Sequence, residues 1–199
     1  MRPLLIIAGL GRCGSSLLTQ MVAACGLRCP DTAPHYEPDE LRPDFGPLPD
    51  QWFEQFDAVK MLHPHRLDWD GDFPAVVVWL DRDRIEQAKS GLKVISAYVA
   101  GLKLAPDAVT RLAQQLDSDR TLAIARLRGW PRIEVQFEDL IGSPYATASR
   151  IAEFAGTFGV ELDAAAMASV AIARGSQCAP DISLELTLQQ REESHGDHP

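Results

Sequence analysis

Residues 4–16 read LLIIAGLGRCGSS, and this stretch decides the fold of the chain. Its first five residues are continuously apolar, as expected of a strand that is covered on both faces of a sheet. A glycine-rich loop follows at residues 9–14. Residues 15–25 then have apolar side chains at helical spacing, and Gly26 is a typical helix end. The chain therefore begins with a strand, a glycine loop and a helix, which is the first unit of an α/β fold.

Strands and helices alternate along the rest of the sequence. We expect strands at residues 58–62 (AVKML) and at the continuous apolar run 75–80, and alternating apolar and polar residues predict a fourth strand at 133–137. Helical spacing and helix-start residues predict further helices at residues 81–100, 107–116, 119–128 and 143–156. We therefore expect an α/β fold with a doubly wound, mostly parallel sheet and a P-loop-like first strand-loop-helix unit.

The chain is expected to form a single domain over residues 1–188. Six prolines between residues 30 and 50 exclude a long helix or a central strand there, so we expect an ordered loop or a lid. The tail at residues 189–199 is polar, and we expect it to be disordered.

Composition restricts the class of function. The 199 residues carry 19 basic and 28 acidic side chains, a net charge of −9. An acidic chain repels a phosphate backbone, so we expect no nucleic-acid partner. No stretch approaches the ~20 apolar residues of a membrane span, and the four cysteines lack the spacing of a zinc site. We expect a cytoplasmic protein with reduced thiols and no membrane partner.

The glycine loop has the features of an anion site. Residues 9–16 match the P-loop pattern G-x-x-x-x-G-K-[ST], except that Ser15 stands at the lysine position. Backbone N–H groups and the helix dipole favour an anion at such a helix start. Arg12 adds a cation, and Ser15 and Ser16 add hydroxyl donors. The alternative is a plain glycine turn, but the cation and the two hydroxyls favour anion binding.

A second polar cluster follows the strand at residues 75–80. Arg82 lies at the strand end and Ser90 lies eight residues later, roughly two turns into the predicted helix. A guanidinium and a hydroxyl placed together can bind one phosphate. The alternative is a solvated, charged helix start, and for an isolated arginine and serine that interpretation is favoured.

Taken together, these two segments resemble the sulfotransferase family. The loop R-x-G-S-S is similar to its 5′-phosphosulfate-binding loop, and Arg82 with Ser90 matches its 3′-phosphate motif. Residues 82–90 (RDRIEQAKS) are close to bacterial carbohydrate sulfotransferases of the trehalose 2-sulfotransferase type. Residues 135–140 (VQFEDL), followed by Ser143-Pro144, resemble the family's YEDL…P segment, with Phe137 in place of tyrosine. The resemblance spans about residues 4–156.

The resemblance implies a co-substrate, 3′-phosphoadenosine 5′-phosphosulfate (PAPS), and no metal. The residues implied to bind it are Arg12, Cys13, Gly14, Ser15 and Ser16 at the 5′-phosphosulfate, Arg82 and Ser90 at the 3′-phosphate, and also Phe137 and Arg174. Apart from this binding role, we expect the helix N-terminus to lower the pKa of the Cys13 thiol. We assign that thiol no catalytic role.

Two residues compete as the general base. Tyr36-Glu37-Pro38 resembles an element of carbohydrate sulfotransferases in which Glu37 would be the base. Residues 60–65 (KMLHPH) resemble an element of cytosolic sulfotransferases in which His63 would be the base and Lys60 would stabilise the leaving group. The sugar-type cluster at residues 82–90 favours Glu37. Together with Arg12 in the loop, these residues form the predicted catalytic set.

The acceptor is expected to be a hydroxyl of a carbohydrate or a small metabolite, bound by one chain or by a homodimer. Two other functions fit the loop. A small-molecule P-loop kinase would need ATP and Mg²⁺, and Ser15 argues against it. A non-catalytic binder of 3′-phosphoadenosine 5′-phosphate (PAP) would use the same anchors but have no working base.

Overall fold

The computed structural model describes residues 2–30, 52–67, 73–98 and 103–173. Within these ranges the strands are β1 (Leu4–Gly9), β2 (Ala58–Leu62), β3 (Ala75–Asp81) and β4 (Arg132–Gln136). They form one sheet in the order β2-β1-β3-β4, and every neighbouring pair is parallel. The sequence prediction of a parallel α/β sheet in a single domain is therefore confirmed.

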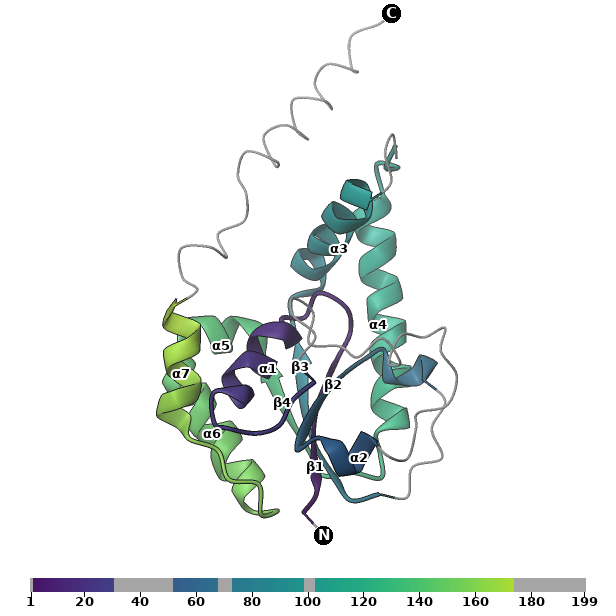
Figure 1. Cartoon of the computed structure of the whole chain (residues 1–199). Helices are drawn as coiled ribbons and strands as arrows, with labels where there is room; N and C mark the ends of the chain where they lie inside the picture. The colour runs from purple at the N-terminus through teal and green to yellow at the C-terminus, as the bar shows by residue number, and fades with distance from the viewer. Residues whose placement is uncertain (1, 31–51, 68–72, 99–102, 174–199) are drawn as a thin grey trace, which may run out of the picture.

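Helices cover both faces of this sheet, as expected of a doubly wound fold (Figure 1). Figure 1 shows α1, α5, α6 and α7 on one side and α3 and α4 on the other. The helices are α1 (Ser15–Ala23), α2 (Trp52–Gln55), the 3-10 helix η2 (Pro64–Arg66), α3 (Arg84–Tyr98), α4 (Ala108–Arg126), α5 (Phe137–Gly142), α6 (Pro144–Gly156) and α7 (Ala164–Ala173). None of the helices in the described ranges is both long and apolar enough to cross a membrane.

Alternate residues of each strand build two separate cores. Leu4, Ile6 and Ala8 of β1 pack with side chains of α3 and α4, whereas Leu5 and Ile7 pack with side chains of α1, α6 and α7. β1 and β3 are buried along their whole length. This double coverage explains their continuous apolar sequences, because a central strand of a parallel sheet meets helices on both faces.

The structure corrects the prediction of two helices at residues 107–116 and 119–128. They form one helix, α4, which runs without a break from Ala108 to Arg126. The polar residues at 117–119 indicated a break, but no glycine or proline lies there. Instead, Asp117 pairs with Arg84 at 2.8 Å and Asp119 pairs with Arg66 at 2.7 Å. Because both carboxylates have partners on other elements, the helix continues through them.

Other elements also differ from the sequence prediction. The fourth strand ends at Gln136, and Phe137 already belongs to α5. The short helix α5 and the helix α7 were not predicted. α7 consists mainly of alanine and other small apolar residues, so its sequence has no polar face to mark its periodicity.

A buried carboxylate connects the sheet to α3 and α4. Asp81, the last residue of β3, accepts hydrogen bonds from Arg84 at 2.6 Å and from Arg120 at 2.9 Å. Burial acts to raise the pKa of Asp81, but the two guanidinium groups outweigh it and hold the pKa below its ordinary value of 3.8. Asp81 is therefore charged at neutral pH and stabilises the folded state.

We expect Asp81→Asn to lower the free energy of unfolding at pH 7 by about 3 kcal/mol, because it leaves two half-buried cations short of a counter-charge. The folded-state pKa of Asp81 is depressed, so the advantage of the wild type is fully present above the ordinary value of 3.8. This stability advantage is lost as the pH falls from 3.8 through the lower pKa that Asp81 has in the folded state. Urea unfolding at pH 7 and at pH 3 measures both effects.

The control is Asp107→Asn, which removes an exposed pair with Arg111 on the surface of α4. It should change the unfolding free energy far less at either pH. Equal losses for the two variants would show that Asp81 has no special part in the fold.

Candidate functional site

Four chain segments that carry predicted site residues begin at one edge of the sheet. In the strand register, Gly9 is opposite both Leu62 and Leu80, and Leu80 is opposite Val135. The glycine loop after β1, His63 after β2, Arg82 after β3 and Phe137 after β4 therefore all start at the carboxyl edge. Ligands of open α/β sheets bind outside this edge.

The loop between β1 and α1 is a tight turn with two residues in the left-handed region. Arg12 and Gly14 have positive φ angles of 68° and 94°. The loop is closed by hydrogen bonds from Cys13 N to Leu10 O at 3.2 Å and from Leu17 N to Gly14 O at 3.0 Å. The first N–H groups of α1 have no acceptor inside the helix, so they add partial positive charge where the loop ends.

Gly14 makes a close contact with the ring of Phe137. A Cβ atom built on Gly14 would overlap the Phe137 ring carbons. The guanidinium carbon of Arg82 lies 4.7 Å from the centroid of the same ring, within the range of a cation–π contact. Phe137 therefore links the loop after β1 to the arginine after β3.

The predicted anchors for the two ends of the nucleotide touch each other. Arg12 Nε donates to Ser90 Oγ at 3.2 Å, and Arg82 Nη1 donates to the backbone oxygen of Arg12 at 3.1 Å. Arg82 Nε is buried and has no hydrogen-bond partner among the described residues. Ser90 thus contacts Arg12, which the sequence placed with the other anchor, and Arg82 contacts the backbone of Arg12.

Lys60 reaches the loop from the neighbouring strand. It lies in the middle of β2, is only 3% exposed, and donates from Nζ to Ser16 Oγ at 3.1 Å. Ser16 stands at the position where the P-loop pattern of nucleotide triphosphatases has a magnesium-binding hydroxyl. An ammonium group from β2 therefore contacts that hydroxyl in this protein.

His63 and Gln87 both bind the backbone of Gly11, His63 at the N–H and Gln87 at the carbonyl oxygen. Gly11 N donates to His63 Nε2 at 3.1 Å, and Gln87 Nε2 donates to Gly11 O at 2.8 Å. Gln87, in α3, is 2% exposed and was not predicted. The sequence did contain a signal for Gln87: it precedes Ser90 by three residues in the predicted helix and therefore lies on the same helix face.

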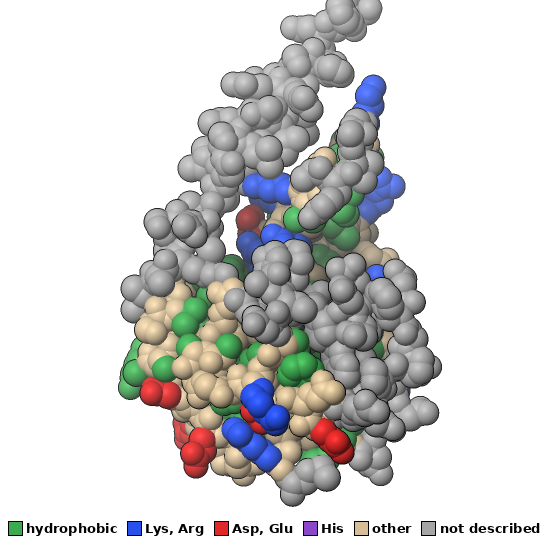
Figure 2. All heavy atoms as spheres, viewed as in Figure 1, with side chains coloured by type: hydrophobic (Ala, Val, Ile, Leu, Met, Phe, Trp, Pro, Cys, Tyr) green, Lys and Arg blue, Asp and Glu red, His purple; other side chains and the backbone are tan. Residues whose placement is uncertain are grey.

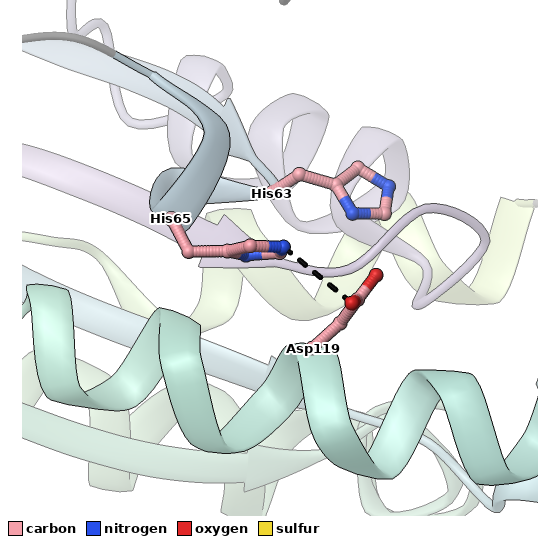
Figure 3. A group of neighbouring side chains, drawn as sticks. All are labelled: His63, His65 and Asp119. Carbon is pink, nitrogen blue, oxygen red and sulfur yellow. Dashed lines mark ion pairs between the residues drawn. The ribbon is translucent and has the colours of Figure 1, made fainter.

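His63, His65 and Asp119 form a cluster beside this loop (Figure 3). One nitrogen of each histidine and one carboxylate oxygen lie within 4.8 Å of one another, close enough to share a metal ion. His65 comes from η2 and Asp119 from α4, and the dashed line in Figure 3 joins His65 Nε2 to Asp119 Oδ1 at 3.6 Å, a contact that is an ion pair only when the histidine is protonated.

The hydrogen bonds of this cluster argue against a metal site. Gly11 N–H donates to Nε2 of His63, and Arg66 Nε donates to Nε2 of His65 at 3.3 Å. A neutral imidazole that accepts at Nε2 carries its proton on Nδ1, so neither ring keeps a free lone pair. Asp119 already accepts from Arg66 and from Gln115, both at 2.7 Å. These contacts fit a structural link between η2 and α4.

Burial and charge keep His65 neutral. Burial lowers the pKa of His65, the Asp119 carboxylate opposes this, and the Arg66 cation lowers it further, so that the pKa lies below its ordinary value of 6.5. A neutral ring suits the acceptor role that Arg66 imposes on it.

The prediction for the thiol of Cys13 is wrong. Cys13 is 1% exposed, and burial raises its pKa above the ordinary value of 9.0, although the neighbouring Ser15 and Lys60 act in the opposite direction. The expectation of a lowered pKa considered only the helix N-terminus and neglected desolvation. Its Sγ packs instead beside Gly9, where a Cβ atom would lie 2.5 Å from it.

Ser15 is buried next to Cys13, and its hydroxyl is within hydrogen-bond reach of that thiol. Of the two predicted hydroxyl donors, Ser16 is the more accessible. Two predicted site residues, Glu37 and Arg174, lie outside the described residues.

The charge of the site is opposite to that of the whole chain. Arg12, Lys60 and Arg82 meet at the loop, although the net charge is −9. In Figure 2, Lys and Arg side chains gather in the upper part of the view, with acidic atoms visible among them, and acidic and basic side chains also mix on the lower part. Three cationic side chains thus contact the loop where the strands end.

No family model matches the chain, and a search of curated proteins also found no match.

We expect Gly14→Ala to cost more stability than its positive φ alone explains. The backbone strain costs roughly 1–2 kcal/mol, and the new methyl group also collides with the Phe137 ring. Gly26→Ala is the matched control, because Gly26 has φ 81° and no atom within 4 Å of the added Cβ. Chemical unfolding of both variants measures the difference.

The double variant Gly14→Ala/Phe137→Leu should recover part of the extra loss, because leucine can move aside. If Gly14→Ala and Gly26→Ala lose the same stability, the contact with Phe137 does not shape the loop.

Proposed function

We propose that this protein is a sulfotransferase that moves a sulfuryl group from PAPS to a hydroxyl of a sugar or a small metabolite. The observation that carries the proposal is the convergence of Arg12, Lys60 and Arg82 on a P-loop that lacks its own lysine. The motif resemblance at residues 9–16, 82–90 and 135–140 gives the chemical identity of the donor.

The contact between the two anchors supports a bisphosphorylated nucleoside as the ligand. The 5′- and 3′-phosphates of PAP belong to one ribose, so their anchors must be neighbours. Arg12 from the loop and Ser90 from α3 are directly hydrogen-bonded, and Arg82 contacts the backbone of Arg12. The unpartnered Nε of Arg82 is a donor suited to a phosphate oxygen.

The contact between Lys60 and Ser16 favours sulfuryl transfer over an ATP-dependent kinase. In kinases of the P-loop type, the hydroxyl at the position of Ser16 holds Mg²⁺. Here the Lys60 ammonium lies 3.1 Å from that hydroxyl, so a divalent cation would meet a like charge. A fixed ammonium at this position neutralises charge on the donor without a metal.

In the proposed reaction the acceptor oxygen forms a bond to sulfur in line with the leaving group. The bond between sulfur and the bridging oxygen of the 5′-phosphate breaks, and PAP leaves with the electron pair. The proton of the acceptor hydroxyl passes to a general base. The loop N–H groups, Arg12 and Lys60 bind and neutralise the transferred group and the leaving phosphate, which is the main requirement of such a transfer.

Ligand binding tests the proposal. We expect PAP at 100 times its dissociation constant to stabilise the protein by about 2.7 kcal/mol, and ATP with Mg²⁺ to stabilise it less at the same concentration. Arg82→Ala should weaken PAP binding about 10-fold to 100-fold, because it removes a charge-assisted contact with the 3′-phosphate. It should weaken binding of AMP, which lacks that phosphate, much less. Thermal shift and calorimetric titration measure these affinities.

Arg111→Ala is the matched control, because it removes an exposed arginine of α4 that pairs only with Asp107 among the described residues. It should leave both affinities unchanged. Stronger stabilisation by ATP with Mg²⁺ than by PAP would favour the kinase. Equal losses of PAP and AMP affinity in Arg82→Ala would reject the assigned 3′-phosphate contact.

Lys60→Met should lower the rate of sulfuryl transfer by about 10²–10³ while the fold is retained, because methionine fills the buried space without the charge. Release of PAP from PAPS with a panel of sugar and alcohol acceptors measures the rate. Lys89→Met removes an exposed ammonium that pairs with Glu86 and should have no effect. Binding of PAP without transfer to any acceptor in the wild type would favour a non-catalytic binder.

A further inference from the structure

His63 is hydrogen-bonded both to the β1 end and its loop and to η2. Its backbone N–H donates to Gly9 O at 3.0 Å, its carbonyl accepts from Arg66 N at 2.8 Å, and its ring accepts from Gly11 N at 3.1 Å. The residue also has a positive φ of 50°, which is uncommon for a non-glycine residue. The strain and the number of contacts indicate that the position of the ring is determined by the loop.

The acceptor role of Nε2 fixes the protonation state of the ring. A backbone N–H can only donate, so Nε2 must offer its lone pair to Gly11. In a neutral imidazole the proton is then on Nδ1, which is buried. With one nitrogen accepting and the other protonated, the ring has no lone pair left to take a proton from an acceptor hydroxyl.

The same hydrogen bond has a structural effect on the residues that follow. Gly11 is held at its nitrogen by His63, from the end of β2, and at its oxygen by Gln87, from α3. The next residue, Arg12, has a positive φ of 68° and directs its side chain to Ser90. A fixed Gly11 therefore stabilises the strained conformation of Arg12.

We propose that His63 is a positioning residue: its neutral Nε2 accepts the Gly11 N–H and thereby holds the β1–α1 loop and Arg12 in the ligand-binding form. It follows that His63 is not the base of sulfuryl transfer; this part of the inference rests on the proposed function. The base is another residue, for which Glu37 is the remaining sequence-predicted candidate.

The first test uses the full chain without any ligand. The ¹⁵N signals of the His63 ring should show a proton on Nδ1 and none on Nε2 near neutral pH. The Gly11 amide should be protected from hydrogen exchange. His63→Ala should speed that exchange at least tenfold, and His63→Gln should restore protection, because the glutamine side-chain oxygen can reach the position of Nε2. His65→Gln, on the neighbouring η2, should leave Gly11 unchanged.

The second test separates positioning from proton transfer. His63→Ala should weaken PAP binding about tenfold, because Gly11 loses its acceptor. His63→Gln, which accepts a hydrogen bond but cannot act as a base near neutral pH, should bind PAP within about threefold of the wild type and transfer sulfate within about tenfold. A loss of 100-fold or more in transfer rate by His63→Gln, with PAP binding intact, is the size expected for a lost base and overturns the inference.

Failure of the inference and failure of the proposed function give different results. A proton on Nε2, or a Gly11 amide that exchanges equally fast in the wild type and in His63→Ala, rejects the positioning role whatever the ligand is. A wild type that does not bind PAP but has the expected ring protonation and Gly11 protection rejects the proposed function alone. If His63→Ala does not fold, the ¹⁵N spectrum of the wild type still decides.

Discussion

The geometry of the site depends on position 14 being a glycine, because no larger residue fits there. The Phe137 ring occupies the space that a Cβ atom would need, and the Arg82 guanidinium packs over that ring. Residues from the loop after β1, the end of β3 and the start of α5 thus form one contact. Arg82 is positioned by an aromatic ring and by the Arg12 carbonyl, and has no carboxylate partner in the described part of the chain. Its charge is therefore not neutralised by a carboxylate of that part of the chain.

The arrangement of charges at the end of β3 separates structural arginines from the site arginine. Asp81 is buried, and Arg84 and Arg120 neutralise it. The adjacent residue, Arg82, contacts the loop instead. Since Asp81 already has two cationic partners, its negative charge repels an anion at the loop less than an unpaired carboxylate would. A chain with a net charge of −9 can in this way keep a positive site.

The strands and the helices α1, α3 and α6 followed from local patterns. β1 and most of β3 are short apolar runs that helices cover on both faces, and such runs are recognisable without tertiary information. The continuity of α4 was not predictable in this way, because Asp117 and Asp119 are stabilised by arginines distant in the sequence. Helix propensity reflects a residue and its neighbours in the sequence, whereas these ion pairs form only once the chain has folded.

For the site, the sequence identified which residues come together but not how they interact. The carboxyl ends of parallel strands lie at one edge of a sheet, so the predicted ends of β2 and β3 were enough to place His63 and Arg82 together. The contact between Arg12 and Ser90, the buried Gln87 and the raised pKa of Cys13 depend on side-chain directions and on burial. Neither is specified by spacing along the chain, so these features became visible only in the structure.

One helix, α4, connects the ends of three strands. Asp119 binds Arg66 after β2, and Arg120 binds both Asp81 at the end of β3 and Glu134 of β4. A helix is stiff along its axis. A substitution that tilts α4 therefore displaces the segment after β2 and the end of β3 together. A change in the position of α4 would therefore reach the loops after β2 and β3 at the same time, whereas a change in a segment that α4 does not contact can act on one loop alone.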